Sequence, residues 1–126
     1  MIFISHDLNM VRRATDRMNV MYKGIIIENG KSEVFINSKN HHPYTKKLID
    51  ITQSDFKDSS IIDSNKTEVA NFGGCSYYDL CEHSFKNEIC SNISPPPISV
   101  KDGKIMINDD PSISWVKCWA FIKDNQ

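Results

Sequence analysis

Residues 54–71 divide the chain in two, and this division is the strongest constraint on how its 126 residues can fold. The stretch is rich in Ser, Asp and Lys and has no steady hydrophobic period, which is typical of a linker. All four cysteines, both tryptophans and four of the five prolines follow Phe72. We therefore expect two units, residues 1–53 and residues 72–126, joined by a polar linker over residues 54–71.

The first unit begins with an apolar run, residues 1–4, whose β-branched and aromatic side chains predict a buried strand. Ser5 is a candidate N-cap, and apolar side chains recurring every three or four residues predict an amphipathic helix over residues 7–18. His6 would then stand at the N-terminus of this helix, where unpaired N–H groups and the helix dipole attract phosphate. A histidine in that position is more often structural or on the surface, so the position alone does not assign a role.

Two short apolar runs flank Lys23-Gly24, and a two-residue connection ending in Gly predicts a β-hairpin over residues 19–28. Pro43 suits the first position of a helix, because its missing N–H would be unpaired there. The helices predicted after the hairpin cover residues 32–36 and 44–51. In the second unit, the strands predicted most strongly cover residues 104–108 and 114–121.

Charge and hydropathy exclude two broad classes. The formal net charge is -1 and the sequence pI is about 6.4, and the basic residues are scattered. These values give no basic patch for nucleic acid. No apolar run approaches the roughly 20 residues that a membrane-spanning helix needs, and no signal peptide is recognisable. We expect a cytoplasmic protein without nucleic-acid binding.

The cysteines are the candidate metal ligands: Cys75, Cys81, Cys90 and Cys118. Their spacing does not match a zinc finger or ribbon, in which paired ligands lie two to four residues apart. Iron–sulfur clusters accept more varied spacing and are held by four thiolates. Zinc, with His83 as a substitute ligand beside Cys81, is the alternative. Four buried thiols without metal are the third possibility, because free cysteine behaves as a small hydrophobe.

The run IFISHDLNMVRRATDRMNVMYKGIIIENG resembles the end of the nucleotide-binding domain of ABC transporters. In that family a strand delivers a switch histidine followed by Asp, then a helix and a closing hairpin. The resemblance implies an α/β fold, the carboxy-terminal remnant of a P-loop NTPase domain over residues 1–53. It also implies that His6 is catalytic and contacts the γ-phosphate of ATP, which suits a reaction catalysed mainly by positioning and charge stabilisation.

The tetrapeptide HPYT at residues 42–45 resembles a motif of the oligopeptide, dipeptide and nickel branch of that family. The pattern GCSYYDLCEHSFKNEIC…WVKCW resembles the cysteine-bearing tail of the same branch, here a small, loop-rich α+β unit. This likeness implies a [4Fe–4S] cluster on the four cysteines. Leu80, Glu82 and Ser114-Trp115 depart from the family pattern. We expect His41-His42 to form a solvated turn rather than a metal site.

The sequence contains no GxxxxGK[S/T] phosphate loop, no LSGGQ-type signature and no strand ending in Asp-Glu. These elements hold the phosphates and magnesium. The resemblance therefore implies that the chain is inactive alone and binds ATP with Mg only together with a missing amino-terminal half. Permease subunits and a second ATP-binding subunit are the implied partners, at the cytoplasmic face of the inner membrane during peptide import. The alternative is a free-standing iron–sulfur or zinc module without nucleotide chemistry.

The hydrophobic content of the first unit leads to a prediction about its stability. Residues 1–51 offer one strand, a helix and a hairpin, which bury little apolar surface against about 1–2 kcal/mol of backbone entropy per residue. We expect this segment to be unstable when produced alone.

Overall fold

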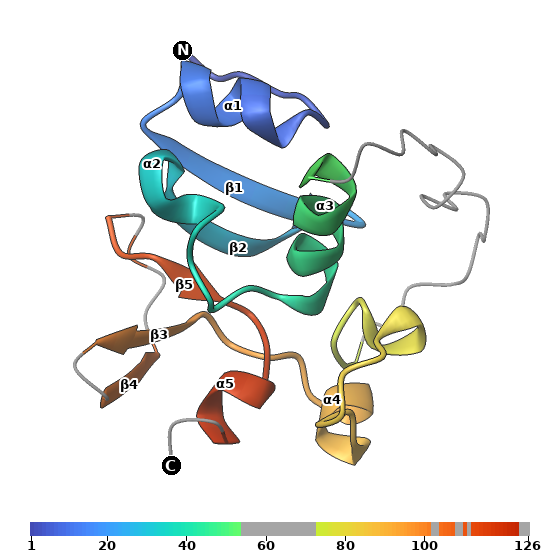
Figure 1. The fold of residues 1–126 in the computed structure, drawn as a ribbon. Coiled ribbons are helices and arrows are strands. Elements are labelled where there is room, and N and C mark those ends of the chain that lie inside the picture. The colour runs from blue at the N-terminus through green and yellow to red at the C-terminus, as the bar shows by residue number, and fades with distance from the viewer. Residues whose placement is uncertain (54–72, 102–103, 108–109, 111, 124–126) are drawn as a thin grey trace.

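One antiparallel sheet contains every strand in the computed structural model, which describes residues 1–53, 73–101, 104–107, 110 and 112–123. The strand order is β1-β2-β5-β3-β4 (Figure 1). Two strands precede the predicted linker and three follow it, so both predicted units contribute to the same mixed α/β fold. The linker itself lies outside the described residues. The strands are β1 (Arg17–Tyr22), β2 (Ile25–Lys31), β3 (Ile98–Lys101), β4 (Lys104–Ile107) and β5 (Trp115–Val116).

The predicted hairpin is confirmed. β1 and β2 pair antiparallel, and the two-residue connection has positive φ at both positions, 46° at Lys23 and 78° at Gly24. Such a turn matches the right-handed twist of the strands it joins. Both strands extend beyond their predicted ends. β2 continues through Gly30, where an added Cβ would lie 2.9 Å from the ring of Phe35.

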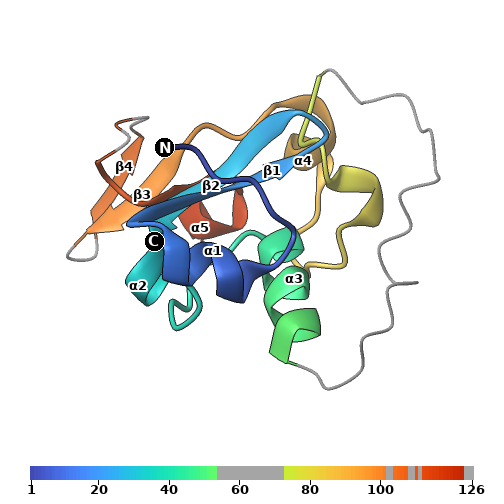
Figure 2. The ribbon, with the colours of Figure 1, turned by 90° about the horizontal axis from the view of Figure 1, so that it is seen from above.

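Three helices cover one side of the β1–β2 hairpin (Figures 1 and 2). They are α1 (Leu8–Ala14), α2 (Ser32–Phe35) and α3 (Pro43–Gln53). Pro43 opens α3 as predicted. Burying an aliphatic or aromatic side chain contributes about 1.5–3 kcal/mol, so the apolar core between helices and hairpin is the main source of stability here. Its buried members are Leu8, Val11, Met18, Val20, Ile27, Phe35 and Ile49.

The first helix is shorter than predicted, and its cap is a different residue. α1 begins after Asp7, whose side chain accepts hydrogen bonds from two backbone N–H groups, and it ends at Ala14. The β-branched Thr15 is extended, and the predicted helical position Met18 lies in β1. Ser5 instead accepts a hydrogen bond from the Asp7 backbone N–H at 3.1 Å. Pairing with β2 therefore outweighs the helical period after Ala14.

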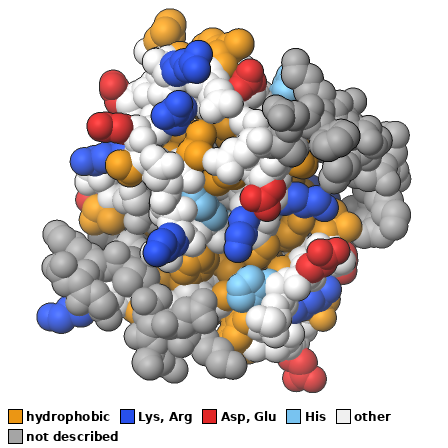
Figure 3. Space-filling model, in the orientation of Figure 1, with side chains coloured by type: hydrophobic (Ala, Val, Ile, Leu, Met, Phe, Trp, Pro, Cys, Tyr) orange, Lys and Arg blue, Asp and Glu red, His pale blue; other side chains and the backbone are white. Residues whose placement is uncertain are grey.

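The predicted strand over residues 1–4 is wrong. This segment has no regular secondary structure, and Ile2 and Ile4 are each 91% exposed. A strand needs a neighbouring backbone to satisfy its N–H and C=O groups, and none of the described strands pairs with this segment. Hydrophobic side chains consequently reach the surface at the N-terminal end of the molecule (Figure 3).

The segment after residue 72 contains short elements connected by turns: the 3₁₀ helix η2 (Tyr78–Leu80), α4 (Glu88–Asn92) and α5 (Ala120–Lys123). β4 agrees with the predicted strand over residues 104–108, although residue 108 is outside the described part. The predicted strand over 114–121 is wrong beyond Val116, because the carbonyls of Cys118 and Trp119 accept helical bonds from Phe121 and Ile122. Among the described helices, none has the length and apolarity needed to cross a membrane.

Candidate functional site

His6 lies in the non-helical segment just before α1, and its side chain is exposed. Asp7 occupies the N-cap position of α1 instead. Its Oδ1 accepts hydrogen bonds from the N–H groups of Asn9 at 3.0 Å and Met10 at 3.1 Å. These N–H groups are thereby satisfied within the chain. The helix end does not form a phosphate site by itself, and the imidazole is left accessible to a partner.

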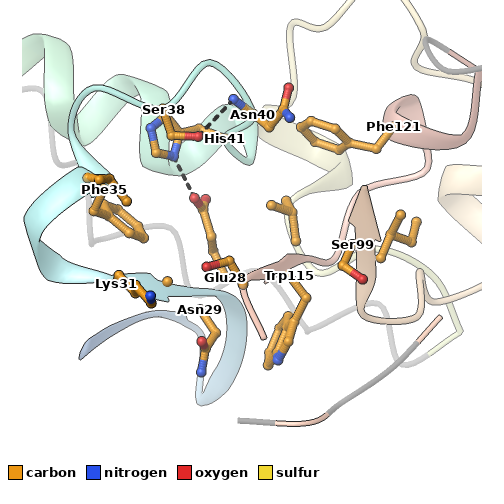
Figure 4. Close-up of a pocket in the computed structure, with 15 residues that line it drawn as sticks. Glu28, Asn29, Lys31, Phe35, Ser38, Asn40, His41, Ser99, Trp115 and Phe121 are labelled. Atoms are coloured by element: carbon orange, nitrogen blue, oxygen red, sulfur yellow. Dashed lines mark hydrogen bonds and ion pairs between the residues drawn. The ribbon is translucent and has the colours of Figure 1, made fainter. Parts of the chain in front are cut away.

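Glu28 is the residue that sequence reasoning missed. It lies on β2, is 2% exposed, and its Oε1 is 2.5 Å from Nδ1 of His41 (Figure 4). Its other oxygen, Oε2, accepts a hydrogen bond from the His42 backbone N–H at 2.9 Å. One carboxylate thus anchors the segment leading into α3. No local pattern in the sequence signals this pairing, because Glu28 and His41 are 13 residues apart and lie in different parts of the fold.

The expected solvated turn at His41-His42 is wrong. His42 is 1% exposed, and the side chain of His41 is 7% exposed. Burial lowers the pKa of His42 to about 4, so this ring is neutral at neutral pH. Its Nδ1 then accepts a hydrogen bond from the Tyr44 N–H at 3.1 Å. His42 is therefore a packed core residue that helps to fix the start of α3.

An aromatic cluster joins this segment to the cysteine-bearing segment. Tyr77 is 4% exposed and meets the ring of Tyr22 edge-on, with centroids 5.1 Å apart. The rings of His42 and Tyr44 each lie 5.5 Å from the Tyr77 ring. Burial is the largest of the effects that raise the pKa of Tyr77 to about 12, so its phenol stays neutral. The cluster docks the first cysteine turn on α3 and the hairpin.

The four cysteines come from four different places in the second segment. Cys75 precedes η2 and Cys81 follows it, Cys90 lies in α4, and Cys118 lies between β5 and α5. All four are free thiols with partly buried side chains. The Cys75 N–H donates to the Cys90 carbonyl at 2.8 Å, which brings these two backbones together.

Burial dominates the ionisation of these thiols. It is the largest of the effects that raise the pKa of Cys118 to about 12, and Cys75, Cys81 and Cys90 make smaller contributions. Burial also raises the pKa of Cys75, with smaller contributions from Cys81 and Cys90. These two thiols are protonated at neutral pH as they stand.

Four thiols are chemically suited to iron–sulfur clusters and zinc. However, among the described His, Cys, Asp and Glu side chains, no group of three or more is placed to hold a metal ion. The cysteines are neighbours without forming a closed coordination shell, and the thiols would have to lose their protons and move together to bind metal. The metal assignment therefore stays a prediction.

A cavity of about 190 Å³ lies where the two segments meet (Figure 4). Glu28 and His41 point toward one another at one side of it, and Trp115 and Phe121 come from the second segment. The ring nitrogens Nε2 of His41 and Nε1 of Trp115 are buried without a hydrogen-bond partner. Both carboxylate oxygens of Glu28 already have hydrogen-bond partners. The cavity is therefore part of the junction at which the two segments pack against each other.

Comparison with known proteins identifies relatives of the chain. It is 46% identical over 48 residues to the oligopeptide transport ATP-binding protein AmiF of Streptococcus pneumoniae, covering 38% of this chain and 15% of that protein. It is 49% identical over 51 residues to the dipeptide transport ATP-binding protein DppF of Haemophilus influenzae, covering 40% and 15%. Its curated homologues are ATP-binding proteins of oligopeptide and dipeptide ABC transporters.

A longer match links the two segments of the chain. The Brucella ovis protein named "Putative peptide import ATP-binding protein BOV_A0348" is 34% identical over 113 residues, covering 81% of this chain and 32% of that protein. A match of that extent must reach from the hairpin into the cysteine-bearing segment. The chain spans well under half the length of each of these ABC transporter relatives. No family model matches the chain, and neither does any solved structure.

Proposed function

We propose that this chain forms the carboxy-terminal part of an ATP-binding subunit that couples ATP hydrolysis to the import of oligopeptides or dipeptides. The observation that carries the proposal is the match to the Brucella peptide import protein over 81% of the chain. A chance likeness in one motif would not extend across hairpin, linker and cysteines together. ATP and magnesium would bind only once polypeptide carrying a phosphate loop joins this chain, because the sequence has no such loop.

His6 is the catalytic residue in this proposal. Its imidazole would donate a hydrogen bond to the γ-phosphate and hold the attacking water in place. Two features support the assignment: the side chain is exposed, and Asp7 rather than His6 caps α1. An exposed ring held just ahead of a capped helix is free to meet a nucleotide presented by another polypeptide.

The partners in this proposal are the missing amino-terminal portion, permease subunits and a second ATP-binding subunit at the cytoplasmic face of the membrane. The apolar segment over residues 1–4 supports the first of these. Ile2 and Ile4 are almost fully exposed, and Phe3 is 38% exposed. An added strand beside this segment would satisfy its backbone and cover these side chains.

The test is an ATPase measurement on this chain co-expressed with an amino-terminal polypeptide that carries the phosphate loop and signature of its relatives. We expect no ATP binding by the chain alone and hydrolysis by the complex. His6→Ala should lower kcat by about 10²–10³, the usual effect of removing one transition-state hydrogen-bond donor. Lys104→Ala changes an exposed side chain on β4 that has no role in this proposal and should leave the rate unchanged. Equal rates for the wild type and His6→Ala would refute the assignment.

Metal binding by Cys75, Cys81, Cys90 and Cys118 is the second proposed function, with a [4Fe–4S] cluster as the preferred group and zinc as the alternative. It is supported by the four free thiols that influence one another's ionisation. Anaerobic purification followed by iron, sulfide and zinc analysis tests it. Cys118→Ser should remove the metal, whereas His83→Ala should do so only for a zinc site that uses His83. Metal-free protein after anaerobic reconstitution would rule this function out.

A further inference from the structure

Cys75 and Cys90 lie on backbones that touch directly. The hydrogen bond from the Cys75 N–H to the Cys90 carbonyl measures 2.8 Å. With the N–Cα bond of Cys75 and the Cα–C=O unit of Cys90, bent by about 120° at the carbonyl carbon, this bond limits the separation of the two Cα atoms to at most about 6.7 Å. Disulfides join cysteines whose Cα atoms are about 4.4–6.8 Å apart. The two Cα atoms therefore lie within the range of separations that a disulfide spans.

The glycine before Cys75 shows independently how closely the two segments are packed. A Cβ added to Gly74 would lie 2.3 Å from the Ser91 carbonyl oxygen and 2.6 Å from that of Cys90. Only glycine allows this approach, so backbone packing holds the pair together. On the other side, the Asn87 side chain caps α4 by accepting from the Cys90 N–H at 3.4 Å.

We propose that Cys75 and Cys90 are a redox modification site and form a reversible disulfide with a small-molecule disulfide such as oxidised glutathione. The thiolate of one cysteine attacks a glutathione sulfur, which forms a mixed disulfide and releases one glutathione thiolate. The second cysteine then attacks the protein sulfur of that mixed disulfide and releases the other. The chain loses two protons and two electrons, and oxidised glutathione becomes two reduced glutathione molecules.

Among the described residues, no direct backbone hydrogen bond joins Cys75 to Cys81 or to Cys118. Cys81 is separated from Cys75 by two successive turns, through Tyr78, rather than by a direct backbone bond. Cys118 lies between β5 and α5, where its carbonyl accepts a hydrogen bond from the Phe121 N–H rather than from another cysteine. The pairing of Cys75 with Cys90 rests on backbone geometry alone, so it holds whether or not the transporter assignment is correct.

The experiment uses the full chain, purified under reducing conditions with a chelator so that metal does not protect the thiols. The protein is equilibrated with defined ratios of reduced to oxidised glutathione, quenched with N-ethylmaleimide, digested and mapped by mass spectrometry. We expect one intramolecular disulfide linking the peptides of Cys75 and Cys90, in most molecules at the oxidising end and reversed by dithiothreitol. Cys75→Ser and Cys90→Ser should each abolish it, and Cys118→Ser should retain it.

Three results would overturn the proposal. The first is a disulfide from Cys75 to Cys81 or to Cys118 as the main product. The second is glutathione attached to separate thiols without an internal bridge. The third is four free thiols at the most oxidising ratio, while the same buffer oxidises a dithiol peptide control. Circular dichroism of each serine variant establishes that the compared proteins are folded.

Discussion

Glu28 and His41 are joined side chain to side chain in the interior, with Oε1 of the carboxylate 2.5 Å from Nδ1 of the ring. The same glutamate also accepts the His42 backbone N–H. It therefore connects the hairpin to the start of α3, and its strand pairs with β5 at Glu28 and Val116.

Replacing Glu28 should destabilise the fold. Glu28→Gln keeps one side-chain oxygen as an acceptor but replaces the other with an NH2 group, so one of the two partners, His41 or His42, loses its acceptor, which costs about 1–3 kcal/mol. Urea unfolding followed by far-ultraviolet circular dichroism measures this loss. Glu33→Gln, on the exposed side of α2, is the matched control and should change stability by less than about 0.5 kcal/mol. Equal stabilities for the two variants would mean that the carboxylate contributes no net stability.

The hairpin and α3 could be predicted because their signals are local. Lys23-Gly24 specifies a two-residue turn, and Pro43 specifies a helix start. The short β5 was overestimated because Trp115 to Phe121 alternate in side-chain type, whereas the backbone bonds of Cys118 and Trp119 turn the chain into a helix. Alternating side-chain types over so few residues do not distinguish a strand from a short helical turn.

The candidate site was predicted only as a set of residue types. The four cysteines could be named from the sequence, but among the described side chains no three of them are placed to hold a metal ion, so their role as ligands stays a prediction. The pairing of Glu28 with His41 could not be foreseen, because it joins residues on different elements whose packing depends on the whole core. The strand over residues 1–4 failed for a related reason. An apolar run shows that side chains need burial, but it does not show which backbone will pair with it.

His42 should make stability depend on pH. Its folded-state pKa is about 4, against 6.5 for an unperturbed histidine, because burial disfavours the charged ring. The unfolded chain therefore binds a proton that the folded chain rejects, and stability falls as pH decreases from 6.5 toward 4. The full loss from this group is about 3 kcal/mol. Urea unfolding at several pH values should show this slope, and His42→Asn should flatten it within that window.

Tyr77 should control the docking of the cysteine-bearing segment. Tyr77→Ala removes ring contacts with Tyr22, His42 and Tyr44, and truncating a buried aromatic side chain costs about 3–5 kcal/mol. If the rest of the chain stays folded, the Cys75 thiol should react faster with N-ethylmaleimide. Tyr78→Ala, whose ring lies under the Lys86 ammonium at 4.4 Å, is the control. An unchanged rate for Tyr77→Ala would show that the cluster does not hold the cysteine turn.

In the turn between β1 and β2, substitutions at two adjacent positions should change the stability of the protein in opposite directions. Lys23 has a φ of 46°, which is unfavourable for most residues but tolerated by asparagine, so Lys23→Asn should stabilise the protein by about 0.5–1 kcal/mol. Gly24 has a φ of 78° and open space around its missing Cβ, so Gly24→Ala adds backbone strain without a clash. That strain should destabilise the protein by about 1–2 kcal/mol. Thermal unfolding of both variants measures the pair. Only a turn with positive φ at both positions favours asparagine first and glycine second. If both substitutions changed stability in the same direction, the turn would therefore be of another type.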